Sequence, residues 1–229
     1  MSRIERDRVT IGNFGSPADP GLRASAALVA ALAAAALSAC GGDSGRKMVA
    51  GQAPPGWADR IAADRAAKDA RFRSDPETPL LAADLSEFRG LSYWPPDPAY
   101  RFSGPILGYD RPKRFTVLST TGKTRPCERY GRILFDVRGR ECALQVYRLL
   151  DVEEVPGDPG FFLPFTDETT GRETYPSGRY VDVEGPPGGP YVVDFNRAYN
   201  PLCAYGAPER YACPITPAEN RLRCRIEAG

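Results

Sequence analysis

Residues 130–150 read YGRILFDVRGRECALQVYRLL and contain the signal that decides the fold. Two strand-sized stretches, residues 130–137 and 142–150, flank the dipeptide Arg138-Gly139. Apolar segments of this length on either side of a glycine-containing turn are typical of a β-hairpin. The sequence therefore predicts two neighbouring antiparallel strands at this place.

The chain around this hairpin has the same character. Glycine and proline turns, such as Thr170-Gly171 and residues 185–190, separate further strand-sized segments. We expect these strands at residues 115–119, 161–165, 179–183, 191–195 and 222–226. The pattern favours a mainly β domain whose antiparallel sheet closes as a barrel or a sandwich.

One helix is predicted in the same domain, at residues 57–72. Alanines are frequent there, and Trp57, Ile61 and Phe72 fit one weakly apolar stripe. Asp75-Pro76 and Thr78-Pro79 end the segment, because proline cannot continue a helix.

An apolar segment precedes this domain. Residues 24–39 read ASAALVAALAAAALSA, carry no charge and follow Arg23. The run is shorter than the ~20 residues that cross a bilayer as a helix, and a basic residue before a short apolar run is typical of an export signal. An uncleaved anchor and a buried alanine-rich helix are the alternatives.

The residues that follow, Leu37-Ser38-Ala39-Cys40, resemble the lipobox of bacterial lipoproteins. The resemblance implies lipid on the Cys40 sulfur and cleavage before it, which would anchor an exported protein to the cell membrane. In a cell with two membranes, the protein would lie on the periplasmic or outer-membrane side. We therefore expect a signal peptide at residues 1–39, a flexible tether at 40–55 and one β-rich domain at 56–229.

The composition excludes several kinds of chemistry. The chain has 30 basic and 29 acidic residues and no histidine. Without imidazole, neither a Ser-His-Asp nor a Cys-His nucleophile system can be built. The near balance of acidic and basic residues does not indicate the basic surface with which proteins bind nucleic acid. No cofactor and no metal site are predicted.

Five cysteines follow Cys40, and an exported protein lies where disulfides persist. Cys203 and Cys213 are ten residues apart in a loop rich in proline, glycine and tyrosine. We expect these two to form a disulfide. Cys142 and Cys224 are interpreted as small buried core residues.

Several polar stretches mark the C-terminal third. Residues 165–180 read FTDETTGRETYPSGRY, residues 194–205 read DFNRAYNPLCAY, residues 213–222 read CPITPAENRL and the chain ends in IEAG. These stretches resemble the bacterial domain-of-unknown-function family catalogued as number 1684. The resemblance covers the chain from about Trp57 onward and implies no particular activity.

These motifs support two interpretations. In one, their oxygen-rich side chains converge on a pocket for a small polar or anionic ligand, in which Arg179 would contact the anion. The residues of this candidate pocket are Asp167, Thr174, Tyr175, Arg179, Asp194, Asn196, Tyr199 and Asn200. In the other, Asp194 and the asparagines bond nearby backbone and stabilise turns.

The function predicted from these features is a non-enzymatic binding or structural module of the cell envelope. The alternative is a hydrolase that uses two carboxylates on an envelope glycan or ester, with Asp167 and Asp194 as the candidates. The two hypotheses differ in whether the carboxylates are free to meet a substrate.

Overall fold

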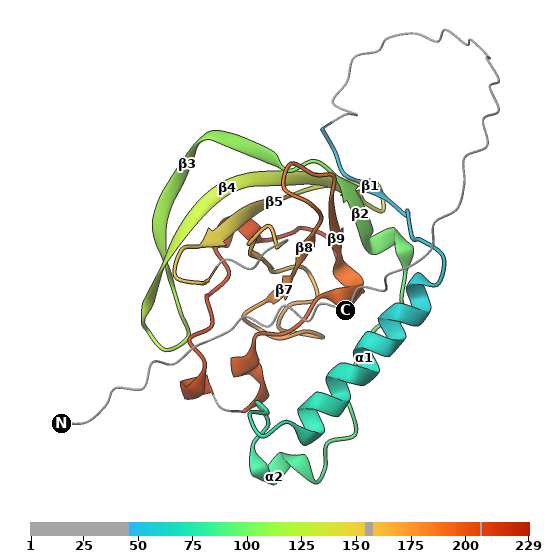
Figure 1. Cartoon of the computed structure of the whole chain (residues 1–229), viewed down its shortest axis with the longest axis vertical. Helices are drawn as coiled ribbons and strands as arrows, with labels where there is room; N and C mark the ends of the chain where they lie inside the picture. Colours follow the sequence, from blue (N-terminus) through green and yellow to red (C-terminus); the bar gives the residue numbers. More distant parts are fainter. Residues whose placement is uncertain (1–45, 154–157, 207) are drawn as a thin grey trace, which may run out of the picture. The chain divides into compact units, whose positions relative to one another are not determined.

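The computed structural model describes residues 46–153, 158–206 and 208–229, which form a mainly β domain (Figure 1). Its strands are β1 (Val49–Ala50), β2 (Arg101–Gly104), β3 (Leu107–Leu118), β4 (Thr124–Val137), β5 (Arg140–Leu149), β6 (Leu163–Phe165), β7 (Arg179–Val181), β8 (Val183–Glu184) and β9 (Tyr191–Asp194). Its helices are α1 (Trp57–Ser74), α2 (Ala82–Leu85) and the short 3-10 helices η1 (Pro98–Tyr100), η2 (Phe195–Arg197), η3 (Leu202–Tyr205), η4 (Pro208–Arg210) and η5 (Ala218–Asn220).

The predicted mainly β, antiparallel character is confirmed, and so is the helix, which continues two residues beyond the predicted end to Ser74. Closure into one barrel is not found. Within the described residues, the strands form three separate sheets, ordered β1-β2-β9-β8, β3-β4-β5 and β6-β7.

Strands β4 and β5 form the hairpin that the sequence predicted. Val137 pairs with Arg140 across the turn. Arg138 and Gly139 have φ angles of 48° and 79°, and two successive positive values are what a type I′ turn requires. β3 pairs with the other side of β4, and the three strands form the curved sheet of Figure 1.

This sheet buries side chains on both of its faces. Val146 of β5 belongs to the main core, whereas the next residue, Tyr147, belongs to a second and smaller core. Successive side chains of a strand point to opposite faces, so the two cores lie on opposite sides of the sheet. The register of β4 shifts between Arg129 and Gly131, and such a bulge lets β4 contribute to both cores.

Aromatic rings connect the three sheets in the main core. The rings of Phe102 in β2 and Phe135 in β4 have centroids 4.8 Å apart. Phe165 of β6 packs edge-on against Phe195, with centroids 5.1 Å apart. Edge-to-face packing at such distances is favourable, and it holds the small sheets against the long hairpin.

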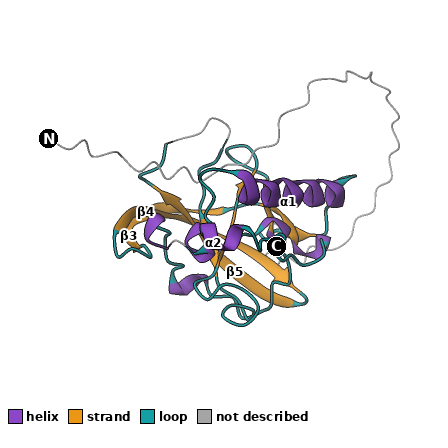
Figure 2. Cartoon of the chain, turned by 90° about the horizontal axis from the view of Figure 1, so that it is seen from below, coloured by secondary structure: helices purple, strands orange, loops and turns teal. Residues whose placement is uncertain are grey.

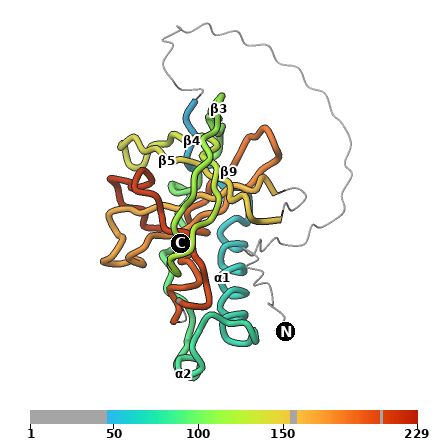
Figure 3. Tube along the Cα trace, turned by 90° about the vertical axis from the view of Figure 1, so that its left-hand side faces the viewer, coloured from blue at the N-terminus to red at the C-terminus, as the bar shows by residue number. Residues whose placement is uncertain are grey.

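The C-terminal segment, residues 221–229, runs into the middle of this domain (Figures 1 and 3). Its even-numbered residues are buried, whereas Arg221 and Arg223 are exposed. The predicted strand at 222–226 is therefore half right. The segment is extended, and buried and exposed side chains alternate along it as in a strand. No strand is found there, because side chains instead of a neighbouring strand bond much of its backbone.

Helix α1 lies on one side of the strands (Figure 2) and is joined to them near its first turns. Trp57 and Ile61 are its buried residues. Arg65 donates hydrogen bonds to the carbonyl oxygens of Trp94 and Asn196, at 2.6 and 3.0 Å. Within the described residues, no helix has the length and apolar character needed to cross a bilayer.

The predicted tether is too long at its C-terminal end. Met48 is buried in the main core, and β1 pairs with β2 through Val49 and Ala50. These residues belong to the domain, because one buried apolar side chain and two strand pairings are enough to hold a short segment. The predicted signal peptide, Cys40 and the first part of the tether lie outside the described residues.

Candidate functional site

The polar residues predicted to line one pocket lie in separate clusters, each with partners of its own. Asp167 follows β6 and is buried. Its Oδ1 accepts hydrogen bonds from the hydroxyls of Thr169 and Thr170, at 2.7 and 3.0 Å, and its Oδ2 accepts one from the Ile226 amide at 2.7 Å. The carboxylate therefore fixes a turn to the C-terminal segment.

Arg179 opens β7 and binds the same segment. Its two terminal nitrogens donate to the carbonyl oxygens of Ala228 and Ile226, at 2.6 and 2.8 Å. The guanidinium lies 3.5 Å from the Asp167 carboxylate and faces the rings of Trp94 and Phe165. Burial lowers the pKa of Arg179, and the charge of Asp167 opposes this shift. With 3% of Arg179 exposed, no room remains for an anionic ligand.

Asp194 forms the second cluster, at the end of β9. It accepts a hydrogen bond of 2.7 Å from the indole N–H of Trp57 and lies 3.8 Å from the Arg101 guanidinium. Its other oxygen accepts from the Asn196 amide at 3.1 Å and so caps η2. The capping role predicted as an alternative is confirmed, and the bond to Trp57 adds an anchor for α1.

Asn196 completes this second cluster. Its side chain accepts a hydrogen bond from the Asp97 amide at 2.8 Å and donates one to the Asp97 carbonyl oxygen at 2.9 Å. The Asn196 side chain thus bonds both backbone groups of Asp97, as a neighbouring strand would, although the two residues are 99 positions apart. Asn196 thus links two loops, and its amide is not free for a ligand.

The remaining pocket residues are dispersed as well. Thr174 contacts the Thr169 hydroxyl at 3.0 Å. A hydrogen bond with Asn200 partly offsets the burial that raises the pKa of Tyr205 to about 12. Burial is the main cause of the raised pKa of Tyr175, which also bonds Cys203. Each of these side chains is engaged with partners close to it, and the structure does not bring the eight predicted residues together in one cluster.

Tyr199 stands apart in a cluster with residues that the sequence did not single out. Its hydroxyl donates to Asp182 at 3.0 Å, and the Lys68 ammonium lies 5.8 Å from its ring centroid. Lys68 lies 5.9 Å from the Tyr93 ring as well. Burial lowers the pKa of Lys68 and raises the pKa of Asp182. The cluster places a charged group of α1 against aromatic rings.

Two adjoining hollows lie along the C-terminal segment, with volumes of about 350 and 440 Å³. Arg221, Leu222 and Arg223 line both of them. Asp167 and Glu168 complete the first, and residues 140–143 complete the second. We call the two together the arginine hollow, after Arg140, Arg221 and Arg223.

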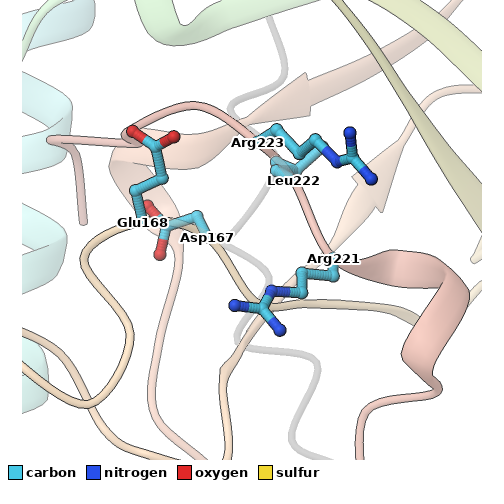
Figure 4. A pocket seen from close by; sticks show the side chains of 5 residues that line it. All are labelled: Asp167, Glu168, Arg221, Leu222 and Arg223. Carbon is cyan, nitrogen blue, oxygen red and sulfur yellow. The ribbon is translucent and has the colours of Figure 1, made fainter.

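The charges around the arginine hollow are unevenly paired. Glu168 lies 3.5 Å from Arg140, and Glu141 lies 2.7 Å from Lys47. Arg221 and Arg223 form no ion pair within the described part of the chain. In Figure 4, the guanidinium group of Arg223 points away from the carboxylates of Asp167 and Glu168. Among the residues that the structure describes, the hollow therefore presents two exposed positive charges, those of Arg221 and Arg223, without an ion-pair partner.

Comparison with known proteins places the chain in a family. The family model described as "Protein of unknown function (DUF1684)" matches residues 86–229. The chain belongs to this family. The polar motifs of the C-terminal third all lie inside the matched residues.

A solved structure extends the DUF1684 comparison to the fold. The chain is 30% identical to an uncharacterized protein of Haloarcula marismortui whose structure was determined by NMR in solution. The likeness has a TM-score of 0.56 and covers 76% of this chain and 92% of the other. A comparison with curated proteins finds no match.

The cysteines of this DUF1684 chain also differ from expectation. Cys203 and Cys213 are free thiols in the structure, so the predicted disulfide between them is not supported. A hydrogen bond from the Cys213 thiol lowers the pKa of Cys203 to about 6. Cys142 and Cys224 are buried, as interpreted, but their sulfur atoms are in contact at 3.1 Å.

Two exposed arginines that line both hollows were not among the site residues predicted from the sequence. Arg221 and Arg223 lie just after the DUF1684 motif asparagine Asn220, and they alternate with Leu222 and Cys224 in an extended segment. That alternation was the available signal, since it places both arginines on one side. Only four of the 30 basic residues are lysines, so arginines are frequent throughout the chain and this pair did not stand out.

Proposed function

We propose that this chain is a lipid-anchored, non-enzymatic module of the cell envelope that binds a small anionic ligand at the arginine hollow. The observation that carries the proposal is the contrast between two sets of charges. Arg221 and Arg223 are exposed beside a hollow and have no ion-pair partner in the described residues. The motif carboxylates, in contrast, are buried and bonded.

The chemistry of the hollow favours a phosphate or a carboxylate. A guanidinium group offers paired N–H donors that match either anion. The volumes of 350 and 440 Å³ suit a small ligand. Leu222 is the apolar residue between the two arginines, so charge and hydrogen bonding would supply most of the affinity.

The alternative of a carboxylate-based hydrolase receives less support. A general acid or base must come within hydrogen-bond reach of its substrate. Asp194 is 3% exposed, bonds Trp57 and Asn196, and does not line the hollow. Asp167 lines it but already accepts bonds from two hydroxyls and one amide.

The binding prediction concerns Arg221 and Arg223. Changing both to alanine should weaken the binding of inorganic phosphate at least about tenfold, because each charge-assisted hydrogen bond contributes about 1.5–3 kcal/mol. Calorimetric titration of the full chain carrying Cys40→Ser, at low ionic strength, measures the change. Added salt should weaken wild-type binding, because exposed charges are screened.

The control variant is Arg111→Ala, in β3 at the opposite edge of the β3-β4-β5 sheet. It removes one exposed arginine that does not line the hollow and should leave binding unchanged. Equal affinity in the wild type and the double variant would contradict the proposal. So would a wild-type chain that binds neither phosphate nor citrate.

Lipid anchoring is the second part of the proposal and rests on the Leu37-Ser38-Ala39-Cys40 box. In cells grown with a fatty-acid probe, Cys40→Ser should abolish labelling of the chain, because the cysteine sulfur is the expected attachment atom. Cys127→Ser changes a buried thiol and should leave labelling intact. Label that persists in Cys40→Ser would exclude this anchor.

A further inference from the structure

Two thiols from distant parts of the chain meet beside the arginine hollow. Cys142 lies in β5 and Cys224 in the C-terminal segment, 82 residues later. Their sulfur atoms are 3.1 Å apart, closer than the roughly 3.5–4.0 Å at which non-bonded carbon atoms rest. A disulfide bond is about 2.05 Å long, so bond formation needs an approach of only about 1 Å.

One residue of the pair lines the hollow. Cys142 is among the residues that line the larger hollow, together with Arg140 and Arg223. A reagent in that hollow therefore meets Cys142 before it meets Cys224. Contact with Cys224 lowers the pKa of Cys142, and the charge of Arg140 acts in the same direction. The thiolate is the reactive form in disulfide exchange.

We propose that Cys142 and Cys224 form a reversible disulfide by exchange with a small disulfide that enters the arginine hollow. The Cys142 thiolate attacks one sulfur of that disulfide, whose S–S bond breaks and releases one thiolate. Cys224 then loses its proton to water and attacks the Cys142 sulfur, which releases the second thiolate. The protein loses two electrons and two protons, and the small disulfide becomes two thiols.

The other cysteines provide an internal comparison. Cys127 is buried in the second core, and burial raises its pKa to about 12. Cys203 and Cys213 are only ten residues apart, so a bond between them would close a short loop. A bond between Cys142 and Cys224 closes a much longer loop and constrains the unfolded chain more strongly.

The disulfide would act on the segment that carries the proposed ligand site. Cys224 lies directly after Arg223 and two residues before Ile226, whose amide binds Asp167. Oxidation would fix this segment to β5 by a covalent bond in addition to its hydrogen bonds. Formation of this disulfide requires neither anion binding nor export, because the two sulfur atoms are already in contact.

The test uses the full chain carrying Cys40→Ser, equilibrated with increasing ratios of oxidised to reduced glutathione. After free thiols are alkylated, peptide mapping without reductant should find Cys142 linked to Cys224. The Tm of the oxidised chain should exceed that of the reduced chain by about 10 °C, as expected for a bond that closes a long loop. Because the redox buffer is set in vitro, the result is the same wherever the protein resides in the cell.

Substitutions separate this pair from the other thiols. Cys142→Ser and Cys224→Ser should each abolish the Tm difference, whereas Cys127→Ser should keep it. Peptide mapping of the unsubstituted pair decides the matter even where a serine variant fails to fold. Alkylation of both Cys142 and Cys224 at the highest ratio would overturn the proposal, as would a bond from Cys224 to any other cysteine.

Discussion

Replacing Arg179 by methionine should lower the free energy of unfolding by about 3–5 kcal/mol, the range for removing one partner of a buried ion pair. The variant leaves Asp167 without its cation and leaves the carbonyl oxygens of Ile226 and Ala228 without donors. For a domain of this size, Tm should fall by about 10 °C or more. Denaturation in urea, followed by circular dichroism, measures the loss.

Two further variants sharpen this prediction. Arg172→Met removes an exposed arginine from the same motif and should change stability by less than about 0.5 kcal/mol. Arg179→Lys keeps the charge but loses the planar pair of donors. Its loss of stability should therefore lie between those of Arg172→Met and Arg179→Met. An Arg179→Met domain as stable as the wild type would show that the arginine does not hold the C-terminal segment.

Asp194→Asn should lower the free energy of unfolding by about 2–3 kcal/mol. The variant loses a buried hydrogen bond to a charged group, and the Arg101 guanidinium loses its counter-charge. A residue that only caps a helix would cost about 1 kcal/mol. Asp97→Asn is the matched control, since Asp97 caps η1 in the same way but has no ion pair with any of the described residues. Thermal unfolding of both variants distinguishes the two roles.

A double-mutant cycle with Trp57→Phe isolates the bond that anchors α1. The indole N–H and the Asp194 carboxylate are 2.7 Å apart, so the two substitutions should not add. If the costs add fully, the bond between the indole and the carboxylate does not anchor α1, and the packing of Trp57 and Ile61 and the hydrogen bonds of Arg65 hold the helix. If Asp194→Asn keeps full stability and loses ligand binding, Asp194 belongs to a binding site.

The fold could be predicted where the signal was local. The β4–β5 hairpin follows from its apolar stretches and from Arg138-Gly139, a pair that the type I′ turn accepts. Strand β3 begins at Leu107, eight residues before the predicted start. Its first half is exposed and charged, as suits an edge strand, and gives no apolar pattern.

The candidate site could not be predicted because its partners are distant in the sequence. Asp167 meets Ile226, which is 59 residues away, and Asp194 meets Trp57, which is 137 residues away. A local pattern shows that these side chains are polar but not that a remote amide or indole already bonds them. The contact between Cys142 and Cys224 could not be predicted for the same reason, since the two residues are 82 positions apart.

The location of the ligand site can be measured directly. The isotope-labelled full chain carrying Cys40→Ser is titrated with inorganic phosphate, and backbone amide shifts are followed by NMR. Shifts should concentrate at residues 140–143 and 221–223, while those of residues 194–200 stay unchanged. Shifts that concentrate at 194–200 instead would contradict the assignment of the polar motifs to structure and of the arginine hollow to binding.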